Sequence, residues 1–417
     1  MKREKNDILA ILVPGVVLSW LTYIFVLSEL KGIYADFNGH TYVYLPMFTK
    51  ETWVKGWMMV PYCMWHLVTL FFHKLLFIPI QSAAAYTTCL FTLFAYFVTV
   101  WMIRKVTEAA GSTESPVRAG LIAFGMCLLQ PLYFDWLDAG GRFLGSFSMN
   151  PIHNPTYMCM RGFSLVCFCL ILDIWGRQKS EDYKGVFFRV ETGLKRYYIY
   201  LAVMLFLSTL AKPTFAEMFI PAVALVMLGE WIVRIRKKDG SAAGYFRHCL
   251  ATLLCAVPAL LYILVQFLAY FIWGGSYGSD GSLVVTRWLE VWHMFTQNVG
   301  LSVGLGMAFP LFMLLINGGY FIKSDWGRLA LAGYGVGFLE AALLGEGGGK
   351  MSHGDFLWPM MSGMLLLFVT AMLRLLVLER TQADTKGRRL ALSGAWFLFC
   401  IQVMYGLLYI KDMMGGG

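Results

Sequence analysis

The chain has 417 residues, of which 58% are hydrophobic and only 14% are charged. A soluble globular protein carries about 25% charged residues, so this chain has too few polar side chains to cover a water-facing surface. Apolar runs near the ~20 residues that cross a bilayer recur along the whole chain. The composition excludes a soluble enzyme and predicts an all-α, polytopic membrane protein, folded as a single integral membrane domain over 1–417.

The net charge is +9, from 34 Lys and Arg against 25 Asp and Glu. In a membrane protein such an excess is typical of basic cytoplasmic loops, so we expect no nucleic-acid partner. The nine cysteines lie mostly inside apolar runs and form no C-x-x-C pair. They indicate neither a zinc site nor a disulfide framework.

We expect about eleven spans, beginning directly after the basic segment MKREKND. The first apolar run is longer than the core of a signal peptide and no A-x-A site follows it, so we expect it to stay uncleaved. The predicted spans are 8–28, 81–103, 117–134, 156–175, 197–211, 214–233, 249–272, 300–321, 329–345, 356–378 and 390–410.

The distribution of basic residues orients these spans. With the N-terminus in the cytoplasm, 24 of the 34 Lys and Arg residues fall on the inner side, as the positive-inside rule requires. The apolar segment 57–80 cannot be a further span, because every later loop would then face the wrong side. We therefore expect it to form a helix lying on or dipping into the outer leaflet.

The unusual polar residues collect in loops on the outer side, where six of the seven histidines also lie. Because functional residues concentrate in loops positioned by a rigid scaffold, we expect one site at the outer membrane face. Its candidate substrate-binding residues are Arg142, His153 and Asn154 in the loop 135–155, Lys212, His66, and Lys350, His353 and Asp355 in the loop 346–355.

Asp36 and His40, in the segment YADFNGHTY, are the candidate catalytic residues. A carboxylate here is suited to act as a general base, and His40 to bind an acceptor or a phosphate. The alternative is a solvated loop in which the pair is incidental. Residues four apart share a helix face, but Gly39 argues against a continuous helix.

Lys212 follows an apolar run of 15 residues, which rises about 22 Å and falls short of the ~30 Å hydrocarbon core. Pro213 should end that helix, leaving Lys212 at or just below the outer interface. A charge there is costly without an anion or water. A lipid phosphate is one partner, and a snorkelling lysine is the alternative.

His66 and His73 share a face of the segment VPYCMWHLVTLFFHKLL. The aromatic residues around them favour an amphipathic interfacial helix, and a role for His66 in the site is the alternative. The segment GEGGGKMSHGDF is no phosphate loop, because Met351 stands where Ser or Thr is needed. GYGVG at 333–337 lies within a span, where small residues allow close helix packing.

No cofactor is certain from the sequence, and a divalent metal is the one that the residue types allow. Asp36, His40, His353 and Asp355 are suitable ligands, but no spacing among them is diagnostic. No G-x-S-x-G elbow of a hydrolase occurs.

Three segments together carry a resemblance: ADFNGHTY at 35–42, VPYCMWHLVTLFFHKLL at 60–76, and AKPTF with the following IPA within 211–222. A basic N-terminus, one span and a long outer loop with an early aspartate and an interfacial helix complete the pattern. This layout resembles the GT-C superfamily of membrane glycosyltransferases. The match divides the chain into a GT-C-like module, 1–235, and variable C-terminal helices, 236–417.

The resemblance implies transfer of a sugar from a polyprenyl-phosphate-linked donor to a glycan or lipid-linked acceptor at the outer membrane face. It implies cell-envelope or surface-polysaccharide assembly in a bacterial plasma membrane. The superfamily's usual early acidic pair is absent, since Phe37 follows Asp36, so the role of base maps onto Asp36 only. Lys212 or Arg142 would stabilise the departing lipid phosphate.

Two other functions stay open. A polysaccharide polymerase or ligase of the O-antigen type relies on arginines in outer loops, of which this chain offers Arg142, Arg161 and Arg287. A secondary transporter or flippase would place ionisable residues within spans. Glu217 and Glu340 are the residues that favour it, although no internal repeat is visible.

Overall fold

The computed structural model of the chain describes most of its length. The described residues are 2–32, 35–49, 57, 60, 62–134, 136, 147–180, 182–189, 193–238, 240–272, 283–347, 351–381 and 385–415.

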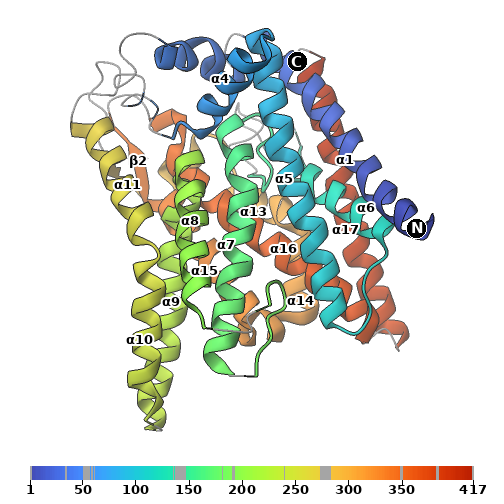
Figure 1. Cartoon of the computed structure of the whole chain (residues 1–417), viewed down its shortest axis with the longest axis vertical. Helices are drawn as coiled ribbons and strands as arrows, with labels where there is room; N and C mark the ends of the chain where they lie inside the picture. Colours follow the sequence, from blue (N-terminus) through green and yellow to red (C-terminus); the bar gives the residue numbers. More distant parts are fainter. Residues whose placement is uncertain are drawn as a thin grey trace.

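Helices make up most of this structure (Figure 1). In the first half they are α1 (Lys2–Glu29), α2 (Asp36–Asn38), α4 (Met64–Leu76), α5 (Ile80–Ala109), α6 (Pro116–Leu128), α7 (Pro155–Lys179), α8 (Lys195–Ala211) and α9 (Thr214–Lys237). In the second half they are α10 (Ser241–Leu254), α11 (Val257–Phe267), α12 (Glu290–His293), α13 (Val299–Gly306), α14 (Ala308–Lys323), α15 (Asp325–Leu343), α16 (Trp358–Thr381) and α17 (Lys386–Met414).

Within the described ranges, six helices are long and apolar enough to cross a membrane, or eight if two bent pairs each count as one span. The multi-pass, almost entirely α-helical character is thus confirmed, whereas the count of eleven spans is not. α6 has 13 residues and α8 has 17, so they rise about 20 Å and 26 Å, less than the ~30 Å hydrocarbon core. α6 stops at Leu128, short of the expected 134, because Pro131 disfavours helix in the residue before it.

Two of the expected spans are bent rather than straight. The expected span 249–272 consists of parts of α10 and α11, which meet at a 44° bend. The expected span 300–321 consists of parts of α13 and α14, which meet at a 79° bend. Pro258 and Pro310 lie in the first turns of α11 and α14. Proline fits a first turn but cannot continue a preceding helix, because it lacks the N–H that the helix ladder needs.

The centre of the bundle is formed by α7 and α16, each with 89% of its apolar window buried, whereas α1, α9 and α17 are peripheral. α16 packs closely on α15 through glycines, as the GYGVG segment predicts. A Cβ on Gly337 would lie 2.5 Å from the Cα of Met360, and one on Gly363 would lie 2.7 Å from the Cα of Tyr334. Only glycine permits this approach.

One end of the molecule carries α4, the start of α5 and the end of α17, and we call it the α4 end (Figure 1). The hydroxyl of Ser28, in the last turn of α1, lies 3.4 Å from the carbonyl oxygen of Met414 in α17. A short antiparallel ribbon of β1 (Leu283–Val285) and β2 (Leu344–Glu346) departs from the expected all-α structure.

The segment 57–80 contains α4, a helix of 13 residues. Trp65 anchors it by donating a hydrogen bond from Nε1 to the Thr88 hydroxyl of α5, at 3.1 Å. Phe71 and Leu75 in α4 and Phe77, the residue directly after it, are exposed, at 56%, 56% and 91%. Exposed apolar residues of this kind suit a lipid contact, and the interfacial position of α4 stays a prediction.

Candidate functional site

Asp36 begins the next helical segment after α1, which ends at Glu29. α2 continues into a π-helix, η1 (Gly39–Tyr44), and a 3₁₀-helix, η2 (Leu45–Thr49). The α-helix ends at Asn38, as the position of Gly39 suggests, but Gly39 keeps helical dihedral angles, φ −57° and ψ −49°, so the helix changes type there without being broken. Glycine costs a helix only about 1 kcal/mol, and burial of Phe37 and His40 offsets a cost of that size.

The start of α7 holds the carboxylate of Asp36. Asn154 donates a hydrogen bond from Nδ2 to Asp36 Oδ2 at 2.9 Å, and its Oδ1 accepts the backbone N–H of Tyr157 at 2.8 Å, which caps α7. Nε2 of His153 lies 4.0 Å from the same Asp36 oxygen, and the Asp36 side chain is 41% exposed. Asp36 is therefore oriented by a helix cap and still accessible to a reactant.

His153 is a half-buried neighbour of this carboxylate, with its side chain 14% exposed. Burial lowers the pKa of His153, the charge of Asp36 opposes that effect, and Lys212 adds to it. Its Nδ1 lies 3.4 Å from the hydroxyl of Tyr409 in α17, and its ring centroid lies 6.0 Å from that of Trp358. The last helix of the chain therefore reaches the site.

His40 and His66 form a buried pair, with His40 Nδ1 and His66 Nε2 3.0 Å apart. Burial lowers the pKa of His66 to about 3. Burial, His66 and Lys212 together hold the pKa of His40 well below its usual range. Both rings are neutral at pH 7, so His40 can act as a hydrogen-bonding group but not as a cation.

Lys212 is the extended residue that ends α8, with φ −164° and ψ 131°, as predicted from Pro213. It is only 7% exposed, and its Nζ lies 4.4 Å from the ring centroid of Trp358 and 5.4 Å from that of Tyr62. Burial lowers its pKa, and Asp355, Asp36 and Glu217 oppose that shift.

Among the residues that the structure describes, no carboxylate approaches Lys212 within ion-pair distance. The aromatic faces stabilise the ammonium in part, but a buried cation of this kind has a strong affinity for an anion. Lys212 is therefore suited to bind an anionic group of a ligand.

A second cluster lies after α15. The ligand atoms of Glu346, His353 and Asp355 all lie within 4.8 Å of one another; Glu346 is buried and the other two are exposed. Two ligands of one metal ion, each about 2.0–2.2 Å from it, are at most about 4.4 Å apart. If these side chains moved slightly closer together, the three residues could hold a divalent ion, with solvent completing its coordination.

Most of the expected site residues thus come together at the α4 end. Hydrogen bonds, ring contacts and charge effects link Asp36, His40, His66, His153, Asn154, Lys212 and Asp355, with His353 beside Asp355. Arg142 and Lys350, the other two expected residues, lie outside the described residues.

Sequence reasoning missed Trp358 and Tyr409, which contact Lys212 and His153. Both lie in apolar spans rich in aromatic residues, so nothing local distinguished them. Of the three arginines first assigned to the outer side, Arg161 is instead buried inside α7, at 2% exposure. Only Arg287 is exposed there among those described.

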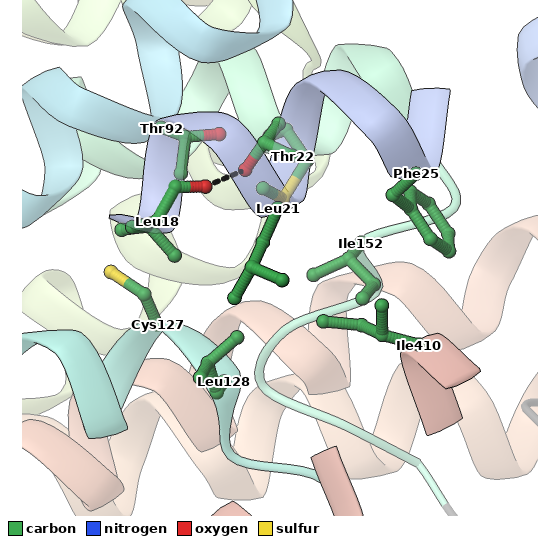
Figure 2. A pocket seen from close by; sticks show the side chains of 10 residues that line it. Leu18, Leu21, Thr22, Phe25, Thr92, Cys127, Leu128, Ile152 and Ile410 are labelled. Atoms are coloured by element: carbon green, nitrogen blue, oxygen red, sulfur yellow. Dashed lines mark hydrogen bonds between the residues drawn. The ribbon is translucent and has the colours of Figure 1, made fainter. Parts of the chain in front are cut away.

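A small apolar cavity lies between α1, α5, α6, α7, α17 and the loop before α7 (Figure 2). Its lining includes Phe25, Ile152 and Ile410. Ile152 precedes His153 in the chain, and Ile410 follows Tyr409. Its volume is about 20 Å³, close to the 10–15 Å³ that a single water requires. It is too small for a sugar or a lipid chain, so it is not itself a substrate site.

Compared with known proteins, the chain matches no protein-family model and no curated protein. The GT-C resemblance therefore depends on the sequence segments alone.

Proposed function

We propose that the protein is an integral-membrane glycosyltransferase, which transfers a sugar from a polyprenyl-phosphate-linked donor to a glycan or lipid-linked acceptor. The observation that carries this proposal is the pairing of an accessible, oriented carboxylate with a buried ammonium. Asp36 is 41% exposed, and the deeply buried Lys212 lies close enough for the two charges to interact. The carboxylate of Asp36 is suited to act as a general base, and the ammonium of Lys212 is suited to stabilise an anionic leaving group.

In the proposed reaction Asp36 accepts the proton of the acceptor hydroxyl as that oxygen attacks the anomeric carbon. The bond between this carbon and the phosphate oxygen breaks, and the electron pair leaves with the lipid phosphate. Lys212 stabilises the developing charge in a site with little water, where such an interaction is strongest.

We propose the outer face of a bacterial plasma membrane as the location, with the N-terminus in the cytoplasm. The basic residues favour this orientation. The contact between Ser28 and Met414 supports an odd number of crossings, as eleven spans require, because it places the ends of α1 and α17 on one side. A role in cell-envelope or surface-polysaccharide assembly follows from the proposed donor.

The test is transfer by the purified protein. It would be reconstituted in liposomes with polyprenyl-phosphate-linked sugars and a panel of lipid-linked acceptors, and the products would be identified by mass spectrometry. Formation of a glycosylated acceptor with release of polyprenyl phosphate is expected. Uptake of solute without any new glycosidic bond would instead favour the transporter, for which Glu217 and Glu340 are the residues to test.

A further inference from the structure

A groove opens between α9, α14 and α15, at the end of the molecule opposite the candidate site. Its volume is about 710 Å³. It lies along α9 from Leu225 to Lys237, and Lys212 precedes the start of this helix. A helix of 24 residues is about 36 Å long, so the groove and Lys212 face opposite membrane leaflets.

One part of the groove is aliphatic. Leu225 and Val233 from α9 and Ile322 from α14 line it and are 54%, 50% and 68% exposed. α9 is long and apolar enough to span a membrane, and only 28% of its apolar window is buried. These side chains are therefore placed to meet lipid chains rather than water.

The other part of the groove carries charged residues. Four of the charged residues in and beside it form a network in which acidic and basic groups pair. Glu230 accepts hydrogen bonds from Lys179 Nζ at 2.8 Å and from Arg328 Nη2 at 2.5 Å. Asp325 pairs with the same two cations. Two carboxylates and two cations offset each other, so this network leaves no net charge in the groove wall.

Two further cations line the groove and are not balanced. Arg234 donates from Nη1 to the Ser241 hydroxyl at 3.1 Å and lies 4.5 Å from the ring centroid of Tyr245. Lys237 is exposed in the last turn of α9. Within the described part of the chain no carboxylate pairs with either residue. The buried Nε of Arg328, in the same wall, likewise has no hydrogen-bond partner among the described residues.

We propose that this groove binds one phospholipid with an anionic phosphodiester head group, its phosphate at Arg234 and Lys237 and its acyl chains along Leu225, Val233 and Ile322. Basic pockets between spans at the inner leaflet bind anionic lipids in this way. The aliphatic wall selects a lipid over a free phosphate, and the two uncompensated cations select an anionic head group over a zwitterionic one. The proposal does not depend on the function proposed for the opposite end.

Delipidated, purified full-length protein provides the test, with bound lipid measured by native mass spectrometry. The probes are phosphatidylglycerol, phosphatidylcholine and inorganic phosphate. Wild-type protein should retain one phosphatidylglycerol in clear preference to phosphatidylcholine, and phosphate should not compete. Arg234→Gln and Lys237→Gln should each weaken this binding about tenfold, the usual effect of losing a charged hydrogen bond.

Gly229 supplies a second variant that leaves these cations intact. It lines the groove, and a Cβ at this position would meet nothing within 4 Å. Gly229→Leu should therefore fill the groove without disturbing the helix and reduce lipid retention. Arg388→Gln, an exposed cation at the start of α17, is the matched control and should have no effect.

Equal retention of the two lipids would overturn the proposal, as would competition by phosphate. So would a folded Gly229→Leu protein that binds phosphatidylglycerol as the wild type does, or an Arg388→Gln variant that loses as much binding as Arg234→Gln.

Discussion

Asn154 and Asp36, 118 residues apart, are joined by a hydrogen bond of 2.9 Å from Nδ2 to Oδ2. The same Asn154 side chain caps α7 through its oxygen. The orientation of the candidate base is therefore linked to the start of one of the two central helices, and this link can be tested from either partner.

Asp36→Asn is expected to lower the transfer rate by ~10²–10⁴, the usual effect of removing a general base. Binding of donor and acceptor should change little, because the amide is isosteric with the carboxylate. His40→Ala should be milder, since a neutral His40 can only orient a substrate. A stable Asp36→Asn protein with the wild-type rate would move the search to Asp355 and Glu346.

Asn154→Asp tests the same link from the other side. The new carboxylate keeps the acceptors that cap α7 but replaces the hydrogen bond to Asp36 with repulsion between like charges. Transfer by the folded protein at neutral pH should fall, and the same repulsion should lower the melting temperature. Unchanged transfer in this variant would show that the orientation of Asp36 is unimportant.

Lys212→Met is expected to weaken binding of the polyprenyl-phosphate donor by about tenfold or more, because a charged hydrogen bond to phosphate contributes roughly 1.5–3 kcal/mol. Folding should be affected less, since methionine suits the buried position beside Trp358. Lys31→Met, an exposed cation at the α4 end, is the control. Donor binding equal to that of the wild type would leave Lys212 as a snorkelling residue.

Acid is expected to destabilise the protein through His66. Its folded pKa is about 3, whereas an unfolded histidine titrates near 6.5. Between these values the unfolded chain binds a proton that the folded protein does not. The free energy of unfolding should therefore fall by up to ~1.4 kcal/mol per pH unit as the pH decreases from about 6.5.

The apparent melting temperature of the solubilised protein between about pH 7 and pH 4 measures this effect. His66→Gln keeps an amide that can bond to His40 but does not titrate, so its melting temperature should depend less on pH. The same dependence in both proteins would assign the acid sensitivity to other groups.

A divalent metal at Glu346, His353 and Asp355 should stabilise the folded protein. At a hundredfold excess of Mn²⁺ over its dissociation constant the gain would be about 2.7 kcal/mol, visible as a higher melting temperature. Glu346→Gln and Asp355→Asn should abolish the shift, and Glu290→Gln, another carboxylate of the chain, should not. A shift that survives in both ligand variants would contradict a metal at this cluster.

The orientation can be tested by labelling single cysteines from outside intact cells. Eight of the nine native cysteines are buried and only Cys400 is exposed, so the Cys400→Ser protein should show little labelling of its native cysteines. Cysteines at Asn38 and Ser352 should react, whereas those at Lys184 and Lys386 should not. Labelling of a cysteine at position 184 would show that the orientation is the reverse of the proposed one, and the candidate site would then not lie at the outer face.

The sequence could predict where several helices lie and which side chains to consider. The expected span 214–233 corresponds to Thr214–Lys237, and 81–103 to Ile80–Ala109, because a run of apolar residues must be helical in a bilayer. The end of α8 before Lys212 followed from the geometry of Pro213.

The contacts between loops could not be predicted. A composition pattern contains no distance between residues 118 positions apart, so the link from Asp36 to Asn154 is visible only in three dimensions. The bend between α13 and α14 and the helical state of Gly39 also depend on packing, which overrides weak local preferences.

The meeting of Ser28 with Met414 has a practical consequence for fusion proteins. A purification tag or fluorescent protein attached after α17 would emerge beside the end of α1, at the end of the molecule that carries the candidate site, and would compete with substrates for space. In the proposed orientation such a domain would also have to be exported. A fusion before α1 avoids both problems, since it would stay on the cytoplasmic side and leave the candidate site open.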